Sequence, residues 1–159
     1  MKIFLVISDT HGDVFTALKV INAYPQINGI IHLGDYYKDA GRLIDQFPDL
    51  EFHVVPGNCD FVFDKPADIL LDIEGKKLLL THGHRYDVKN GLERLENKAK
   101  RENVDAVLFG HTHTPYIGYR SNTLFVNPGS LYYSRGSGAK TYALLEVSSK
   151  GIEARGLDA

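Results

Sequence analysis

The chain has 159 residues, of which 43% are hydrophobic and 24% are charged, which is typical of one soluble globular domain spanning residues 1–159. These values exclude an intrinsically disordered chain, a collagen-like chain and a coiled coil. A formal net charge of −2 argues against a general nucleic-acid binder, although it leaves room for a local positive site.

In the first third of the chain, short apolar runs alternate with amphipathic helical patterns, as in an α/β domain. The spacing of apolar residues predicts one helix that begins after Asp13 and ends near 24–25, and a second that ends at Pro48. Buried strands are predicted at 2–8, 29–33 and 51–55. This order of elements predicts a parallel βαβαβ unit.

The second half of the chain is richer in hairpin patterns. A helix is expected around 92–99, and a short buried strand at 106–109. Hairpins are predicted for the pairs 68–73 and 77–81, 116–120 and 123–126, and 142–147 and 152–155. We therefore expect a more antiparallel second half, and two packed β-sheets with helices outside.

Polar residues follow five of the predicted strands. They are Asp9-Thr10-His11, Gly34-Asp35, Gly57-Asn58-Cys59-Asp60, Thr81-His82-Gly83-His84 and Gly110-His111-Thr112-His113. Because ligand sites of α/β sheets lie at the carboxyl ends of strands, these clusters are expected to converge on one crevice. Imidazole, carboxylate and amide oxygen are suitable ligands for divalent ions such as Mn²⁺, Fe²⁺, Zn²⁺ or Ni²⁺. The candidate ligands are too numerous for one four-coordinate ion, so two ions about 3.5–4 Å apart are expected.

Three of the motifs have a commoner structural explanation when taken alone, whereas for His111-x-His113 a metal site and a structural role are equally favoured. Asp9-x-His11 by itself is more often a helix-capping loop, and Gly34-Asp35 and Gly57-Asn58 are ordinary turns. His32 and His53 lie within predicted strands and are expected to be core histidines with satisfied hydrogen bonds. The joint occurrence of the motifs at five strand ends favours a metal site.

Other residues next to the candidate ligands have two explanations. Arg85 and Arg135 are either phosphate contacts or solvated surface residues. Aromatic residues that form either the wall of a substrate site or part of the core are Tyr36, Tyr37, Phe61, Tyr132 and Tyr133.

The ordered motifs resemble those of the calcineurin-like metallophosphoesterases, and the short chain with its Gly-Asn-Cys-Asp segment is similar to the small YfcE-like phosphodiesterases. The resemblance runs from residue 1 to about 127–130. It implies an α/β fold in four layers, αββα, with two packed β-sheets flanked by helices. The ligand sets that it implies are Asp9, His11 and His113 for one metal ion, Asn58, His82 and His111 for the second, and Asp35 as a bridge between them.

The resemblance also implies a function. We expect a metal-dependent phosphodiesterase in which a hydroxide between two divalent metal ions attacks a small phosphodiester or nucleotide-like substrate. Mn²⁺ is the first expectation for both ions, with Fe²⁺, Zn²⁺ or Ni²⁺ as alternatives. Asp35 and Asn58 are the expected catalytic residues. Cys59 and His84 are candidates for contacts with the substrate or with the ligands.

Two positions depart from the pattern of many larger relatives. Cys59 stands where those proteins have a histidine that is usually assigned as the acid for the leaving group. Lys38 stands where they have an aspartate that orients this acid, and the nearest aspartate here is Asp39. Because general-acid help is commonly worth about 10²–10⁴ in rate, its loss favours diesters or activated esters over phosphoproteins.

Other classes of function stay open. The retromer scaffold subunit resembles this fold and is a protein-binding module, although relatives of that type have lost metal ligands that this chain keeps. A phosphomonoesterase or a nuclease also fits the chemistry, but the near-neutral charge argues against a stable nucleic-acid complex. A single cysteine and only short apolar runs predict a cytoplasmic protein without membrane contact. The sequence leaves the oligomeric state open, a homo-oligomer included.

Overall fold

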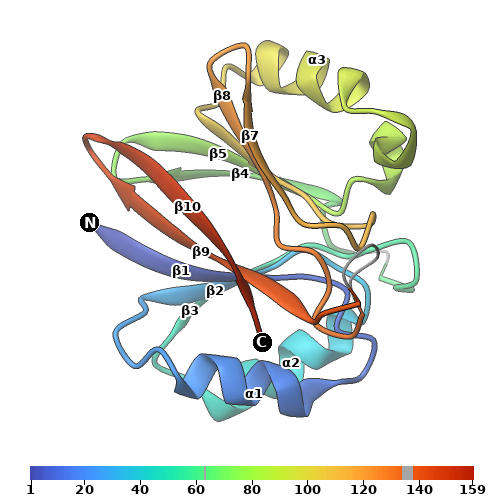
Figure 1. Cartoon of the computed structure of the whole chain (residues 1–159), viewed down its shortest axis with the longest axis vertical. Helices are drawn as coiled ribbons and strands as arrows, with labels where there is room; N and C mark the ends of the chain where they lie inside the picture. Colours follow the sequence, from blue (N-terminus) through green and yellow to red (C-terminus); the bar gives the residue numbers. More distant parts are fainter. Residues whose placement is uncertain (63, 134–137) are drawn as a thin grey trace.

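The computed structural model describes residues 1–62, 64–133 and 138–159. In these residues the chain forms two five-stranded β-sheets and three α-helices. The sheets lie between helices: α1 (Val14–Asn22) and α2 (Tyr37–Gln46) lie below one sheet, and α3 (Glu93–Glu102) lies above the other (Figure 1). The expected four-layer αββα fold is confirmed.

The first sheet has the strand order β10-β9-β1-β2-β3. Its strands are β1 (Lys2–Ile7), β2 (Gly29–His32), β3 (Glu51–Val54), β9 (Thr141–Ser148) and β10 (Gly151–Asp158). β1, β2 and β3 are parallel, as the βαβαβ pattern predicts, so their carboxyl ends lie at one edge. β9 pairs antiparallel with β1 on its other side, a long-range pairing that the sequence pattern did not indicate.

The second sheet has the strand order β4-β5-β6-β8-β7. Its strands are β4 (Asp68–Ile73), β5 (Lys76–Thr81), β6 (Ala106–Leu108), β7 (Tyr116–Arg120) and β8 (Thr123–Asn127), and two short 3₁₀ helices, η1 (His84–Tyr86) and η2 (Val88–Asn90), precede α3. All three predicted hairpins are present. The expected antiparallel character is only partly correct, because β5, β6 and β8 are parallel. The helical crossover through α3 returns the chain to the start of the sheet before β6.

Three apolar clusters hold the four layers together. On β1, Phe4 and Val6 pack between the two sheets, while Leu5 and Ile7 pack towards the helices of the first sheet. This alternation follows from the strand geometry, since successive side chains point to opposite faces. Among the described residues no helix is long and apolar enough to cross a membrane.

A buried chain of hydrogen bonds fixes the loop between β1 and α1. His32 is fully buried, and its Nδ1 accepts a hydrogen bond from Gly34 N at 3.2 Å. Thr10 Oγ1 lies 3.3 Å from His32 Nε2 and donates to Asp39 Oδ2 at 2.7 Å, so His32 Nε2 must be the donor to Thr10. Asp39 Oδ2 also accepts from Gly12 N at 2.8 Å. His32 is therefore a core histidine with satisfied hydrogen bonds, as expected, and it is held in its neutral form.

We predict that acid weakens the fold through His32. Burial lowers the pKa of His32 from 6.5 to about 4, so between these values the unfolded chain binds a proton that the folded chain does not. Stability therefore falls as the pH falls from about 6.5 to about 4. The free energy of unfolding of the chelated protein can be measured in urea at pH 7 and at pH 4.5. The decrease between these pH values should be about 2–3 kcal/mol smaller in His32→Gln than in wild type. An equal decrease in the free energy of unfolding for wild type and variant would contradict this.

Candidate metal centre

Four of the candidate ligands from three loops lie within one small volume. Asp9, His11, Asp35 and His113 each offer a ligand atom, and these atoms lie within 4.8 Å of one another. Asp9 and His11 follow β1, Asp35 follows β2, and His113 follows β6. Asp9 Oδ1 is 3.0 Å from His113 Nε2, and Asp35 Oδ2 is 3.9 Å from His11 Nε2. The carboxyl ends of strands from both sheets therefore meet at this point.

The other three candidate ligands form a second group that shares Asp35 with the first. His82 Nε2 lies 3.0 Å from Asn58 Oδ1, 3.1 Å from His111 Nδ1 and 3.6 Å from Asp35 Oδ2. Asn58 follows β3, His82 follows β5, and His111 follows β6. All seven residues that the sequence analysis selected as ligands are thus brought together.

The hydrogen-bonding groups of this cluster suit a cation. His82 Nδ1 lies 2.7 Å from Leu33 O, and because a carbonyl oxygen only accepts, Nδ1 carries the ring proton. The lone pair of His82 Nε2 then faces two other acceptors, the oxygens of Asn58 and Asp35. His11 Nε2 is buried and has no hydrogen-bond partner among the described residues. Acceptor oxygens that converge on imidazole nitrogens fit a divalent metal ion.

The protonation states of the cluster also suit a metal ligand set. Asp9 is fully buried; Ser8 Oγ donates to its Oδ2 at 2.5 Å and His111 N at 3.3 Å. Burial opposes ionisation, but the contact with His113 and the nearby His82 outweigh it and hold the pKa of Asp9 below its ordinary value. Burial, reinforced by His82, lowers the pKa of His111 to about 4. At neutral pH the carboxylate is therefore charged and this imidazole neutral, as metal binding requires.

Five of the seven candidate ligands have a left-handed backbone. Their φ angles are 54° for Asp9, 44° for His11, 55° for Asp35, 71° for His111 and 56° for His113. This conformation costs a residue with a side chain about 1–2 kcal/mol, and such strain gathers at functional sites. The chain therefore turns sharply at the ligand itself.

Glycine next to the ligands lets the loops touch. A Cβ atom at Gly57 would overlap Asp35 Oδ1. A Cβ atom at Gly34, which has a φ of +98°, would lie 2.7 Å from Gly57 N and 2.8 Å from His82 Nδ1. The loops after β2, β3 and β5 therefore approach so closely that a side chain at either glycine would separate them.

Comparison with known proteins is consistent with this site. The sequence model of the calcineurin-like phosphoesterase superfamily domain matches residues 1–150. The chain belongs to this family. It is a family of metal-dependent phosphoesterases, so the resemblance found in the motifs is confirmed.

Several known proteins are similar to this chain over most of their length. The probable metallophosphoesterase YsnB of Bacillus subtilis is 33% identical over 158 residues, which cover 97% of this chain and 89% of YsnB. The phosphodiesterase YfcE of Escherichia coli is 26% identical over 163 residues, covering 87% and 84%. A predicted phosphoesterase from Streptococcus pneumoniae superposes with a TM-score of 0.81 at 27% identity, covering 99% and 89%. Vps29 of Entamoeba histolytica with zinc shares the fold, with a TM-score of 0.78 at 23% identity over 98% of both chains.

Two supports of this metallophosphoesterase site were not recognised from the sequence. Asp60 accepts hydrogen bonds from Gly57 N and Tyr37 N, both at 2.8 Å, and so joins the loop after β3 to the start of α2. Ser130 Oγ donates to Asp9 O at 2.9 Å. Asp60 stands three residues after Gly57, a spacing at which an aspartate commonly closes a turn, so this signal was available. The contact of Ser130 joins distant segments and had no local signal.

Cys59 and His84 lie beside the cluster. Cys59 N donates to Asp35 Oδ1 at 2.9 Å, and its thiol is exposed. Burial and the nearby Asp35 raise the pKa of this thiol. The ring of His84 is 5.5 Å from that of His82 and 6.0 Å from that of His111.

The remaining candidates divide between the surface and the site. His53 is half-buried rather than in the core, with its Nε2 2.8 Å from Glu51 Oε1. Arg85 is exposed, and Arg135 lies outside the described residues. Instead of packing in the core, all five aromatic candidates line cavities next to His11, namely Tyr36, Tyr37, Phe61, Tyr132 and Tyr133.

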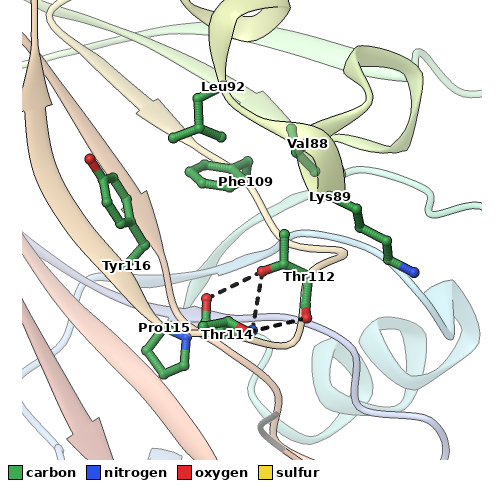
Figure 2. Close-up of a pocket in the computed structure, with 8 residues that line it drawn as sticks. All are labelled: Val88, Lys89, Leu92, Phe109, Thr112, Thr114, Pro115 and Tyr116. Carbon is green, nitrogen blue, oxygen red and sulfur yellow. Dashed lines mark hydrogen bonds between the residues drawn. The ribbon is translucent and has the colours of Figure 1, made fainter. Parts of the chain in front are cut away.

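Hydrogen bonds between Thr112 and Thr114 hold the loop between β6 and β7 (Figure 2). Thr112 and Thr114 line a separate, largely apolar cavity of about 520 Å³. Thr112 Oγ1 accepts hydrogen bonds from Thr114 N at 3.1 Å and from Asn127 Nδ2 at 3.0 Å. These bonds tie the loop that carries His111 and His113 to β8.

We predict opposite effects for two glycine-to-alanine substitutions. Gly57→Ala forces a Cβ atom onto Asp35 and should destabilise the protein by about 1–3 kcal/mol and reduce its metal content. Gly41→Ala is the matched control, because a Cβ atom there meets nothing within 4 Å and the residue lies inside α2. It should stabilise the protein by about 0.5–1 kcal/mol. Thermal unfolding and metal analysis test this, and a Gly57→Ala protein that matches wild type in both would contradict it.

Proposed function

We propose that this metallophosphoesterase is a phosphodiesterase that acts with two divalent metal ions, Mn²⁺ before Fe²⁺, Zn²⁺ or Ni²⁺. The observation that supports it most is the convergence of six other ligand-type side chains around Asp35, with acceptor oxygens close to imidazole nitrogens. The name of YfcE as a phosphodiesterase supports the reaction class. The proposed ligand sets are Asp9, His11 and His113 for one ion, Asn58, His82 and His111 for the other, and Asp35 for both.

The ligand residues have distinct tasks in this proposal. When bound, two divalent ions would lower the pKa of a water molecule to about 7 and offset the charge of a phosphate. Asp35 keeps Oδ1 engaged by Cys59 N, which leaves Oδ2 directed towards His82 and His11. Among the seven ligands only Asp9 and Asp35 are anionic. Two carboxylates would not cancel the positive charge of two divalent ions. The site with both ions bound would therefore attract an anionic diester.

The absence of a histidine at position 59 supports activated diesters as the preferred substrates. The raised pKa of Cys59 keeps its thiol protonated at neutral pH, but a thiol is a weak hydrogen-bond donor. Lys38 is exposed, and Asp39 uses its Oδ2 to accept hydrogen bonds from Thr10 and Gly12 rather than to orient Cys59. We therefore expect small diesters with acidic leaving groups to react faster than monoesters.

A second candidate function is a protein-binding scaffold. It is supported by the fold shared with Vps29. The strained backbone at five candidate ligands favours an enzyme, and so does His11 Nε2, which has no hydrogen-bond partner in the described part of the chain, because a scaffold needs neither feature. A phosphomonoesterase or nuclease activity of the same centre is tested by the choice of substrate.

Metal removal tests the proposal most directly. Chelation should abolish hydrolysis of bis(4-nitrophenyl) phosphate, and Mn²⁺ or a similar ion should restore most of it. Full activity in a sample shown to be free of metal would overturn the metal-dependent mechanism. A metal-loaded protein that hydrolyses neither this diester nor 4-nitrophenyl phosphate would support the scaffold.

Substitution of Asp35 tests its shared role. Because its carboxylate faces members of both groups, Asp35→Asn should lower the content of both ions and reduce kcat/KM by about 100-fold or more. His53→Gln removes a histidine that pairs with Glu51 and should retain wild-type metal content and turnover. Near wild-type turnover in Asp35→Asn, or loss of metal from folded His53→Gln, would show that the assignment is wrong.

A further inference from the structure

Two cavities meet at His11 and Tyr36, beside the proposed metal centre. One, of about 530 Å³, is also lined by Lys38 and Phe61, and we call it the lysine cavity. The other, of about 520 Å³, is also lined by Tyr132 and Tyr133, and we call it the tyrosine cavity. A phosphodiester carries two ester groups that diverge from one phosphorus atom. Two cavities that share an edge at a candidate metal ligand match this shape.

The walls of both cavities expose aromatic rings. Phe61 is 89% exposed and Tyr132 is 55% exposed, which is unusual for large apolar side chains. The rings of Tyr36 and Tyr132 lie 5.2 Å and 5.9 Å from the ring of His11. Each cavity thus offers a flat aromatic surface within reach of the site, suitable for stacking against a ring of the substrate.

The two cavities differ in charge. Lys38 Nζ lies 5.2 Å from the centre of the Tyr36 ring, in the lysine cavity. The carboxylate of Asp60 in the same cavity is engaged by two backbone N–H groups, those of Tyr37 and Gly57. Among the described residues that line the tyrosine cavity, none is a lysine or an arginine. Among the described lining residues, an ammonium group therefore faces only the lysine cavity.

We propose that the lysine cavity binds the leaving group of the diester, an alcohol that carries an aromatic ring, and that the tyrosine cavity binds the ester group that stays on phosphorus. The assignment rests on the proposed function. A water oxygen forms the new bond to phosphorus, and the ester bond on the side of Lys38 breaks. Its electron pair departs with the leaving oxygen, and water supplies the proton that this oxygen takes up. Lys38 stabilises the negative charge that develops there.

Two diesters with the same leaving group separate the cavities. Methyl 4-nitrophenyl phosphate and phenyl 4-nitrophenyl phosphate both release 4-nitrophenol but differ in the group that is retained. Phe61→Ala should lower kcat/KM for both diesters by about 3- to 10-fold. Tyr132→Ala should lower it only for the phenyl diester, and so remove the advantage of phenyl over methyl. Phe15→Ala is the control, since Phe15 is 78% exposed but does not line either cavity.

The leaving-group role of Lys38 has a kinetic signature. In a series of methyl aryl phosphates, Lys38→Gln should make kcat/KM fall more steeply as the pKa of the released phenol rises. A purely structural role of Lys38 would change all substrates equally. Equal slopes for wild type and Lys38→Gln, or a Phe61→Ala variant that removes the phenyl advantage, would overturn the assignment.

Binding of the product gives a readout that does not depend on turnover. Phenyl phosphate keeps the retained group, so Tyr132→Ala should weaken its binding to the metal-loaded protein about 3- to 10-fold relative to methyl phosphate, while Phe61→Ala should not. The reverse pattern would overturn the assignment. Binding through Tyr132 without hydrolysis of either diester would support the tyrosine cavity as a site for an aryl phosphate, but it would contradict the phosphodiesterase function and with it the leaving-group role of Lys38.

Discussion

The sharp turn at the end of each strand is the constraint on which the site depends. Asp9, Asp35 and His111 stand two or three residues beyond β1, β2 and β6 with positive φ, so the chain reverses where the ligand side chain must point inward. At about 1–2 kcal/mol for each residue, five such turns consume a sizeable share of a domain's stability. The apolar clusters on both faces of each sheet offset this strain, and they end directly below the ligands, at residues such as Leu33 and Phe109.

At the start of α2, the aspartate stands at position 39, one residue later than in many larger relatives, and Lys38 takes its place. Neighbouring residues on a helix point about 100° apart, so an aspartate at position 39 faces a different direction from one at position 38. Asp39 is buried and holds Thr10 and Gly12, whereas Lys38 is exposed beside the ligand loops. The carboxylate therefore supports the loop after β1, and the ammonium group lies at the lysine cavity.

Much of the fold and of the site was predictable, because both depend on local patterns. Apolar runs and the polar residues directly after them indicate where the strands end. The parallel order of the first three strands predicts that their carboxyl ends lie at one edge of the sheet. The pairing of β6 was not predictable, since three buried residues carry no signal for their neighbours. The same holds for β9, which joins β1 across most of the chain. The role of Asp39 was not predictable either, because it depends on contacts with Thr10 and Gly12 in another loop.

The long-range closure of the site has a consequence during synthesis on the ribosome. Asp9 and His113 are 104 residues apart, and Ser130, which holds the backbone of Asp9, is 121 residues away. A nascent chain that has exposed β1, β2 and β3 therefore carries Asp9, Asp35 and their strained loops without the partners from β6 onward. β1 also keeps one open edge until β9 emerges. The cluster, like the first sheet, can therefore be completed only after most of the chain has left the ribosome.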